Sequence, residues 1–265
     1  MNNHQIQSTL FKALREAGSL LKASLSRRGG YETKQSELSL VTQTDREAER
    51  IIIGLIRQSF PDHAILAEES LGSGTSPHRW VIDPLDGTTN FAHTYPVCCV
   101  SIAYEYEGQV QIGGIFDPFR DELFFASKGG GAFLNEEQIH VSKTPRLTEA
   151  LLSTGFPYDR KKNIDMYVAP VRDFLMHIHG IRRTGSAALD MCYVASGRFD
   201  GYFESKLSPW DIAAAGLIVV EAGGRLSNYA GKPFTLTGSQ TVASNGLIHD
   251  AMLEVLKPHQ HVGLS

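Results

Sequence analysis

The sequence predicts an α/β fold in which an α+β N-terminal lobe is joined to an α/β C-terminal lobe. Two stretches with helical spacing of apolar residues open the chain, and β-type segments follow them. From about residue 148 strands and helices alternate, which is typical of a layered α/β arrangement. No linker rich in Pro, Gly or Ser separates the halves. We therefore expect residues 1–265 to form one domain, with lobes at roughly 1–147 and 148–265.

The N-terminal lobe is expected to begin with two helices. Apolar residues keep helical spacing over residues 6–25, and Gly29-Gly30 is expected to end that helix. Thr44 and Glu47 are spaced as a capping box for a second helix that runs to Ser59. A mostly antiparallel sheet should follow. Its predicted strands are Ala64–Ala67, Trp80–Asp83, Val97–Tyr106, Gln109–Phe116 and Glu122–Ser127.

Short turns punctuate the sheet and lead into the C-terminal lobe. Residues 106–109, Tyr-Glu-Gly-Gln, are typical of a hairpin turn, and Lys128 with the three glycines after it predicts another turn. The alternating elements of the second lobe are predicted as strands at Leu151–Gly155, Ile181–Thr184, Phe199–Glu204 and Thr241–Ser244 and as helices at Ile164–Met176, Ala187–Ala195, Pro209–Glu221 and Leu247–Leu256.

Composition excludes several classes of function. With 25 Lys and Arg against 29 Asp and Glu the net charge is −4, so nucleic acid is not an expected partner, and basic pairs such as Arg182-Arg183 are interpreted as helix-end or surface charges. The longest apolar run, residues 212–220, is too short to span a membrane, and we expect a cytoplasmic protein. Cys98, Cys99 and Cys192 form neither a disulfide framework nor a zinc pattern, and we expect buried free thiols.

The most informative segment is residues 80–91, Trp-Val-Ile-Asp-Pro-Leu-Asp-Gly-Thr-Thr-Asn-Phe. An apolar strand runs into Asp83 and Asp86, and the carbonyl of Leu85 lies between these carboxylates. Such oxygen ligands suit Mg²⁺, while Gly87 and Thr88 can offer backbone N–H groups to a phosphate. The structural alternative is a polar turn in which Asp86 only caps a helix. The coincidence of all these residues favours metal-assisted phosphate chemistry.

Other acidic residues lie at the ends of predicted strands or at the starts of predicted helices. Glu68 directly follows the strand Ala64–Ala67, although Glu-Glu-Ser alone is most often a solvated turn. Asp45 and Asp211 each lie in the first turn of a predicted helix, where an acidic residue is commonly only a favourable partner of the helix dipole. Local sequence does not decide between that role and a ligand role.

Two further segments have simple structural interpretations. Residues 185–188, Gly-Ser-Ala-Ala, join a strand to a helix, where backbone N–H groups could meet a substrate oxygen or where the chain could merely pack closely. His259 and His261 lie in a polar tail and are expected to be disordered, and none of the ten histidines has ligand spacing.

Taken together, these segments resemble the inositol monophosphatase family of Mg²⁺-dependent, lithium-sensitive phosphatases. The resemblance covers nearly the whole chain, in matching order and spacing, and it implies a layered αβαβα sandwich of the sugar-phosphatase type that assembles as a homodimer. The segments that carry it are residues 66–70, 80–91, 184–188 and 210–224.

The resemblance also implies a role for each site residue. The metal ligands would be Glu68, Asp83, Leu85, Asp86 and Asp211, which hold two Mg²⁺. Asp45 and Thr88 would orient the attacking water, and Lys34 would lie on a loop near a third, weaker metal. The residues that would contact the substrate are Asp86, Gly87, Thr88, Gly185, Ser186, Ala187, Glu204 and Asp211.

Two positions depart from the family pattern. Ser39 stands where many relatives have Asp or Asn, which weakens the case for a third metal. Lys206 lies between Glu204 and Asp211 and adds a positive charge near the expected substrate rim, which would suit a substrate more anionic than a simple monophosphate.

The resulting hypothesis is Mg²⁺-dependent hydrolysis of a phosphate monoester on a small polyol or sugar by direct attack of a metal-activated water. Inositol-1-phosphate is the expected substrate. One alternative keeps the chemistry but takes fructose-1,6-bisphosphate, histidinol phosphate or a 3′-phosphonucleotide. Another is a regulatory or binding protein that retains the fold. The complete set of acidic residues argues against that second alternative, because a protein without catalysis does not need it.

Overall fold

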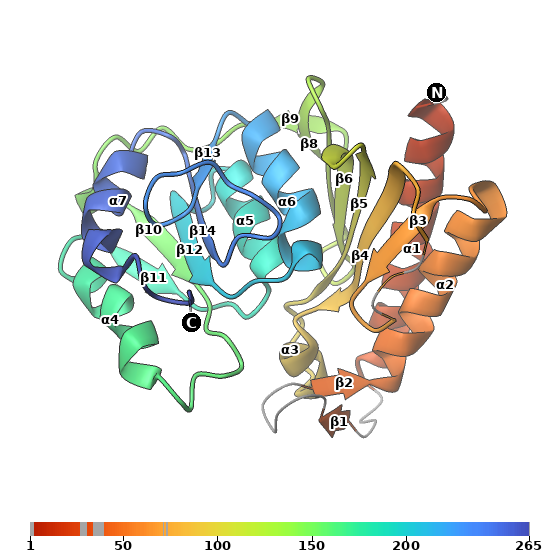
Figure 1. Ribbon diagram of the computed structural model, residues 1–265, viewed down its shortest axis with the longest axis horizontal. Helices are drawn as coiled ribbons and strands as arrows, with labels where there is room; N and C mark the ends of the chain where they lie inside the picture. The colour runs from red at the N-terminus through yellow and green to blue at the C-terminus, as the bar shows by residue number, and fades with distance from the viewer. Residues whose placement is uncertain (1–2, 27–30, 34–39, 71, 73, 265) are drawn as a thin grey trace.

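The computed structural model describes all residues except 1–2, 27–30, 34–39, 71, 73 and 265. Its elements form five layers, α, β, α, β and α, which are seen side by side in Figure 1. Helices α1 (Asn3–Ser24) and α2 (Gln43–Ser59) form one outer layer, and α4 (Ile164–Leu175) and α7 (His249–Leu256) form the other. The predicted αβαβα sandwich is confirmed.

The start of α2 differs from the prediction. Thr42, not Thr44, is the N-cap residue, and its capping box is completed by Asp45, whose Oδ2 accepts a hydrogen bond of 2.9 Å from the Thr42 backbone N–H. Thr44 and Glu47 have the right spacing but lie inside the helix. Gln43 donates to Glu47 there, within the first turn. The expected helix end at Gly29-Gly30 lies outside the described residues, and α1 ends at Ser24.

The larger sheet has seven strands in the order β3-β4-β5-β6-β7-β8-β9. Strands β3 and β4 are parallel and the other pairs are antiparallel, as expected for most of this lobe. The predicted hairpin is confirmed, since Tyr106 of β5 pairs with Gln109 of β6. The strands are β3 (Ala64–Ala67), β4 (His78–Asp86), β5 (Cys99–Tyr106), β6 (Gln109–Asp117), β7 (Glu122–Ser127), β8 (Gly131–Leu134) and β9 (Glu137–Ile139).

The smaller sheet has five strands in the order β11-β10-β12-β14-β13. Its strands are β10 (Leu151–Thr154), β11 (Gly180–Arg182), β12 (Gly201–Ser205), β13 (Arg225–Ser227) and β14 (Gln240–Ser244). Strand β10 is parallel to both neighbours, whereas β14 is antiparallel to both of its own. A separate two-stranded sheet joins β1 (Tyr31–Thr33) to β2 (Leu40–Thr42).

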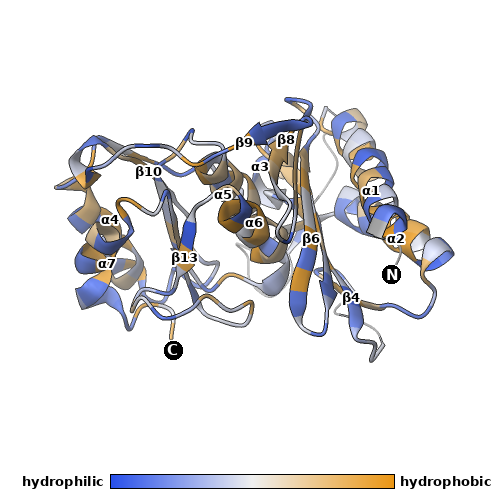
Figure 2. Ribbon diagram, turned by 90° about the horizontal axis from the view of Figure 1, so that it is seen from above, coloured by the Kyte–Doolittle hydropathy of each residue, from blue (hydrophilic) through white to orange (hydrophobic). Residues whose placement is uncertain are grey.

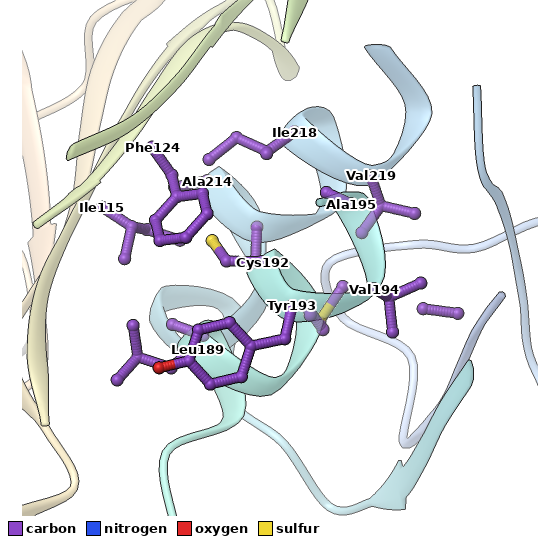
Figure 3. Close-up of a cluster of buried hydrophobic side chains, with 14 of the residues drawn as sticks. Ile115, Phe124, Leu189, Cys192, Tyr193, Val194, Ala195, Ala214, Ile218 and Val219 are labelled. Atoms are coloured by element: carbon purple, nitrogen blue, oxygen red, sulfur yellow. The ribbon is translucent and has the colours of Figure 1, made fainter. Parts of the chain in front are cut away.

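Two apolar helices fill the space between the sheets. Residues 188–195 of α5 (Ala187–Ala195) are all buried, as are most residues of α6 (Pro209–Glu221), and both helices are largely apolar in Figure 2. Figure 3 shows Phe124 and Ile115 of the larger sheet packed against Leu189 of α5 and Ile218 of α6. Such burial supplies most of the free energy that holds the layers together. Cys98, Cys99 and Cys192 are buried free thiols, as expected.

The described C-terminal residues, up to 264, include the short 3₁₀ helix η2 (Lys257–His259), so the expected disorder of this polar tail is wrong. His259 is buried, and its Nε2 lies 2.7 Å from Oδ2 of Asp173, close to the end of α4. The sequence could not show this contact because the two residues are 86 positions apart. Within the described part of the chain, no helix combines the length and apolar character that a membrane crossing requires.

We predict that His249 makes folding stability depend on pH. Its ring is fully buried between Ser227 and Ser244, each 2.8 Å from one ring nitrogen. Burial, and then the charge of Arg225, lowers the pKa of His249 from 6.5 to about 4. The unfolded chain therefore binds this proton more readily. The stabilisation is complete above about pH 6.5 and is lost as the pH falls towards 4.

The measurement is urea unfolding of the wild type and His249→Gln at several pH values. The variant should be less stable at pH 7, and the difference in unfolding free energy should shrink by roughly 2 kcal/mol by pH 4.5. His93→Gln is the matched control because His93 is exposed. A difference between wild type and His249→Gln that does not change with pH would contradict the prediction.

Candidate active site

Two parallel strands bring the first carboxylates together. Ala67 of β3 lies opposite Ile82 of β4, and the N–H of Glu68 donates to the Ile82 carbonyl at 3.2 Å. Because the two strands are parallel and paired in this register, Glu68 and Asp83 lie side by side. Two residues that are fifteen positions apart in sequence therefore share one site.

Strand β4 continues past its predicted end and carries both aspartates. Its register with β5 shifts between Asp83 and Asp86, and the N–H of Leu85 donates to Oδ1 of Asp83 at 3.0 Å. Gly87 then adopts φ +95° as the N-cap of the short helix α3 (Thr88–Ala92). A Cβ at Gly87 would lie 2.9 Å from the Val97 carbonyl, so only glycine fits this turn.

Helix α5 holds Asp86 from the other lobe. Oδ2 of Asp86 accepts hydrogen bonds of 2.6 Å from the Ser186 hydroxyl and 2.8 Å from the Ala188 N–H. Ser186 is the N-cap of α5, so Asp86 lies at the positive end of that helix dipole. Segments one hundred residues apart are joined directly at the site.

Asp45 and Asp211 each cap a helix at the site, Asp211 lining the cavity and Asp45 in contact with Thr88. Asp211 completes a capping box at the start of α6, where its Oδ2 accepts from the Ser208 N–H at 2.7 Å. Asp45 caps α2 with Oδ2, and its Oδ1 accepts from the Thr88 hydroxyl at 3.1 Å. Each carboxylate caps its helix with one oxygen and has a second oxygen for the site. The helix-capping role and a ligand role are therefore compatible for these residues.

These elements surround one cavity of about 310 Å³. Every site residue predicted from the sequence lines it, with two exceptions: Asp45 lies behind Thr88, and Lys34 lies outside the described residues, as does Ser39. The predicted residues that line the cavity are Glu68, Asp83, Leu85, Asp86, Gly87, Thr88, Gly185, Ser186, Ala187, Glu204 and Asp211.

Sequence reasoning missed several lining residues. Asp190 lies in the first turn of α5 and is buried, and Tyr158 comes from the loop after β10. Arg182 ends strand β11 and Arg183 follows it, so neither is a helix-end charge. Both are exposed, as expected of surface charges, but Arg183 also lines the cavity. For Asp190 the signal was an acidic residue in the first turn of the predicted helix Ala187–Ala195. Arg183 and Tyr158 carried no local signal.

The acidic residues of the cavity repel one another. The pKa of Asp83 lies well above its usual range because the group is buried and because Glu68, Asp86 and Asp211 carry like charge. Burial, followed by Asp86 and Glu68, likewise raises the pKa of Asp211. Burial also raises the pKa of Glu204 to about 7 and that of Asp45 to about 6. A cation in the cavity would relieve this repulsion.

The donors fit a hard divalent cation. They are carboxylate oxygens and one backbone carbonyl, without sulfur or imidazole, which are the ligands that Mg²⁺ and Ca²⁺ prefer. Among the described residues, no three His, Cys, Asp or Glu side chains are already placed closely enough to hold a metal ion. Coordination would therefore require the carboxylates to close on the ion, which their mutual repulsion opposes until the ion is present.

The comparisons with known proteins agree with this geometry. The model of the inositol monophosphatase family matches residues 2–261. The chain belongs to this family. It is therefore a phosphatase, a phosphoric monoester hydrolase. Members of the family act on phosphorylated substrates and depend on metal ions.

Individual relatives carry two kinds of name. The chain is 50% identical over 220 residues to an inositol-1-monophosphatase of Synechocystis, which covers 82% of this chain and 76% of that protein. It is 42% identical over 255 residues to Nus factor SuhB of Pseudomonas aeruginosa, with 94% of each chain covered. The solved structure of inositol monophosphatase from Anabaena has a TM-score of 0.88 at 40% identity and covers 97% of each chain.

We predict that Asp83→Asn will abolish stabilisation by Mg²⁺. At a hundredfold excess over Kd, bound Mg²⁺ should raise the unfolding free energy of the wild type by roughly 2–3 kcal/mol. The variant removes one of the repelling charges and a carboxylate that is predicted to bind the metal. Without metal it should be at least as stable as the wild type, and it should gain nothing from Mg²⁺.

Thermal unfolding with and without MgCl₂ measures both effects. Asp62→Asn is the matched control because Asp62 is exposed and does not line the cavity. It should keep the full response to Mg²⁺. An Asp83→Asn variant that Mg²⁺ stabilises as much as the wild type would remove Asp83 from the ligand set.

Proposed function

We propose that this phosphatase hydrolyses inositol-1-phosphate to inositol and phosphate with the help of two Mg²⁺. The observation that carries the proposal is the convergence of Glu68, Asp83, Asp86 and Asp211 on one cavity beside three helix starts. The carboxylates suit divalent cations, and helix N-termini favour the phosphate anion. The inositol-1-monophosphatase of Synechocystis supports this substrate through its 50% identity.

The proposed metal ligands form two overlapping sets. Glu68, Asp83 and the Leu85 carbonyl would hold the first ion, and Asp83, Asp86 and Asp211 the second. When bound, Mg²⁺ would supply the charge that activates a water and stabilises the leaving oxygen. Two solved structures at 26% identity support the use of metals. One is an IMPase/NADP phosphatase complexed with NADP and Ca²⁺, and the other is a staphylococcal inositol monophosphatase soaked in LiCl.

Thr88 and Asp45 are the proposed means of orienting the attacking water. The Thr88 hydroxyl has one proton and two acceptors, Oδ1 of Asp45 and the carbonyl of Leu85, each at 3.1 Å. Thr88 lines the cavity, and its hydroxyl oxygen keeps a lone pair that can accept a hydrogen bond from water. The water would donate one hydrogen bond to the Thr88 oxygen, and the hydrogen bond to Asp45 would hold the hydroxyl group in place. The third metal near Lys34 stays a prediction.

The proposed polyol site is the part of the cavity lined by Glu204, Ser186 and the backbone at Gly185 and Ala187, and it is called the substrate end below. Oε2 of Glu204 accepts from the Tyr202 hydroxyl, which fixes the carboxyl group, and Oε1 can accept from a substrate hydroxyl. Hydroxyl groups on neighbouring carbons of a polyol offer such donors in series.

The alternatives differ in what they require of the cavity. A sugar bisphosphate, histidinol phosphate or 3′-phosphonucleotide would use the same carboxylates, so only the substrate end discriminates. The name Nus factor, carried by relatives such as that of P. aeruginosa, suggests a role besides hydrolysis. The intact acidic set favours the enzyme as the main function, and a role as a binding protein would not need it.

The homodimer that the resemblance implies is also part of the proposal. Helix α4 exposes an apolar stripe of Ile164, Val168 and Leu175, and Met176 follows with 79% of its surface exposed. Strand β11 is the neighbouring free edge of the smaller sheet. A second copy is a suitable partner for this surface because burial would remove the stripe from water.

The proposed function predicts Mg²⁺-dependent release of phosphate from inositol-1-phosphate. The experiment is a panel of esters that includes fructose-1,6-bisphosphate, histidinol phosphate and a 3′-phosphonucleotide, each with MgCl₂ and with EDTA. Asp83→Asn should release no phosphate from any ester although it folds. A higher kcat/KM for another ester would replace the substrate, and release that continues in EDTA would refute the metal-assisted chemistry.

We predict that Thr88→Ala will lower kcat roughly a hundredfold with little change in KM, because Thr88 is proposed to act on the attacking water more than on substrate binding. Thr88→Ser keeps the hydroxyl and should retain most of kcat. Steady-state kinetics on inositol-1-phosphate separates the two constants. An increase in KM at constant kcat would assign Thr88 to substrate binding instead.

A further inference from the structure

Gly155 lies next to Glu204 at the substrate end of the cavity. It directly follows strand β10, which is parallel to β12 and pairs Thr154 with Phe203, so the next two residues in this register are Gly155 and Glu204. The Thr154 hydroxyl supports the pairing by donating to the Phe203 carbonyl at 2.7 Å. Both Gly155 and Glu204 line the cavity.

The carboxyl group of Glu204 occupies the space in which a side chain on residue 155 would begin. A Cβ on Gly155 would lie closer than 3.0 Å to Cδ, Oε1 and Oε2 of Glu204, a separation that Cβ atoms do not show. The backbone of Gly155 has no positive φ, so its conformation alone does not require a glycine. What the site needs from this glycine is the space that it leaves.

Tyr202 holds the Glu204 carboxyl group in that space. Oε2 of Glu204 accepts a hydrogen bond from the Tyr202 hydroxyl, and both residues lie on the same face of β12, two positions apart. Tyr202 is fully buried, whereas Glu204 keeps 9% of its surface exposed. The Tyr202 hydroxyl and the space over Gly155 together define where Oε1 would meet a substrate hydroxyl.

A side chain at position 155 would move the carboxyl group and not the strand. The three atoms in conflict are the far end of a flexible side chain, so rotation about the bonds of Glu204 relieves the contact without a shift of the backbone. The hydrogen bond from Tyr202 is then lost, because Oε2 is one of these atoms. A larger residue therefore disturbs the recognition of hydroxyl groups more than it disturbs folding.

We propose that Gly155 is a positioning residue that makes the cavity prefer hydroxylated substrates, because it leaves the space in which Tyr202 holds the Glu204 carboxyl group. This inference rests on the proposed polyol site and extends it to a residue without a side chain. Gly155 would determine the preference for a polyol ester over an ester with the same ring and no hydroxyl groups.

The test compares inositol-1-phosphate with cyclohexyl phosphate, which has the same six-membered ring without the hydroxyl groups. The ratio of their kcat/KM values should fall roughly tenfold to a hundredfold in Gly155→Ala, as expected when a hydrogen bond to a charged group is lost. Gly201→Ala is the matched control. A Cβ there would lie 2.6 Å from Sδ of Met252, a flexible side chain of α7 on the outer face of the same sheet. This variant should keep the wild-type ratio.

A double-mutant cycle separates positioning from a general loss of structure. In a Glu204→Ala background the carboxyl group is absent, so Gly155→Ala should have no further effect on the ratio. An additional fall in that background would overturn the inference, and so would an equal loss of kcat/KM for both esters in Gly155→Ala alone.

Calorimetric titration with both esters in CaCl₂ repeats the comparison without turnover. Gly155→Ala should weaken binding of inositol-1-phosphate at least tenfold more than binding of cyclohexyl phosphate. If the wild type releases no phosphate from any ester, the proposed function fails, whereas this selective loss of binding would still support the role of Gly155. A wild type that shows no preference for inositol-1-phosphate over cyclohexyl phosphate, in turnover or in binding, would contradict that role.

Discussion

The arrangement of this protein depends on the cost of placing several acidic side chains in one buried cavity. Burial and the like charge of neighbouring carboxylates oppose folding. The raised pKa values of Asp83 and Asp211 reflect that cost. The fold offsets part of it with helix starts. Asp45, Asp86 and Asp211 each accept hydrogen bonds from the N-terminal turn of a different helix. The remaining repulsion is what a divalent cation would remove, so the same charges that burden folding provide the affinity for metal.

The hydrogen bonds from the helix N-termini to the carboxylates determine where α5 and α6 lie between the sheets. The N-termini of α5 and α6 must point at the edge of the larger sheet, which places both helices between the two sheets, as Figure 1 shows. Most of their remaining residues are then buried and apolar, as Figures 2 and 3 show. Electrostatics at one end of each helix and apolar packing along the rest are therefore two requirements on the same segments.

The sequence predicted the long elements well because their periodicity is local, and α5 and α6 have the predicted bounds. Short strands such as β8 and β13 were missed, since three or four residues carry no period of their own. The site residues were predicted from motifs, whereas the partners of Asp86 and His259 lie about a hundred positions away and have no local signal. Thr42 and Thr44 both have an acidic residue three positions on. The spacing alone therefore cannot distinguish the true N-cap, Thr42, from Thr44.

Arg183 shows where local interpretation fails most clearly. A basic pair at the end of a short strand has the same sequence pattern whether it lies on an open surface or at the rim of a cavity. Here the turn at Gly185 brings Arg183 to the rim. Lys206 illustrates the reverse, because a charge beside the site is cancelled by Asp159 from another loop. The charge that a substrate meets is therefore set by which cations remain unpaired after folding. That property follows from tertiary contacts and not from composition.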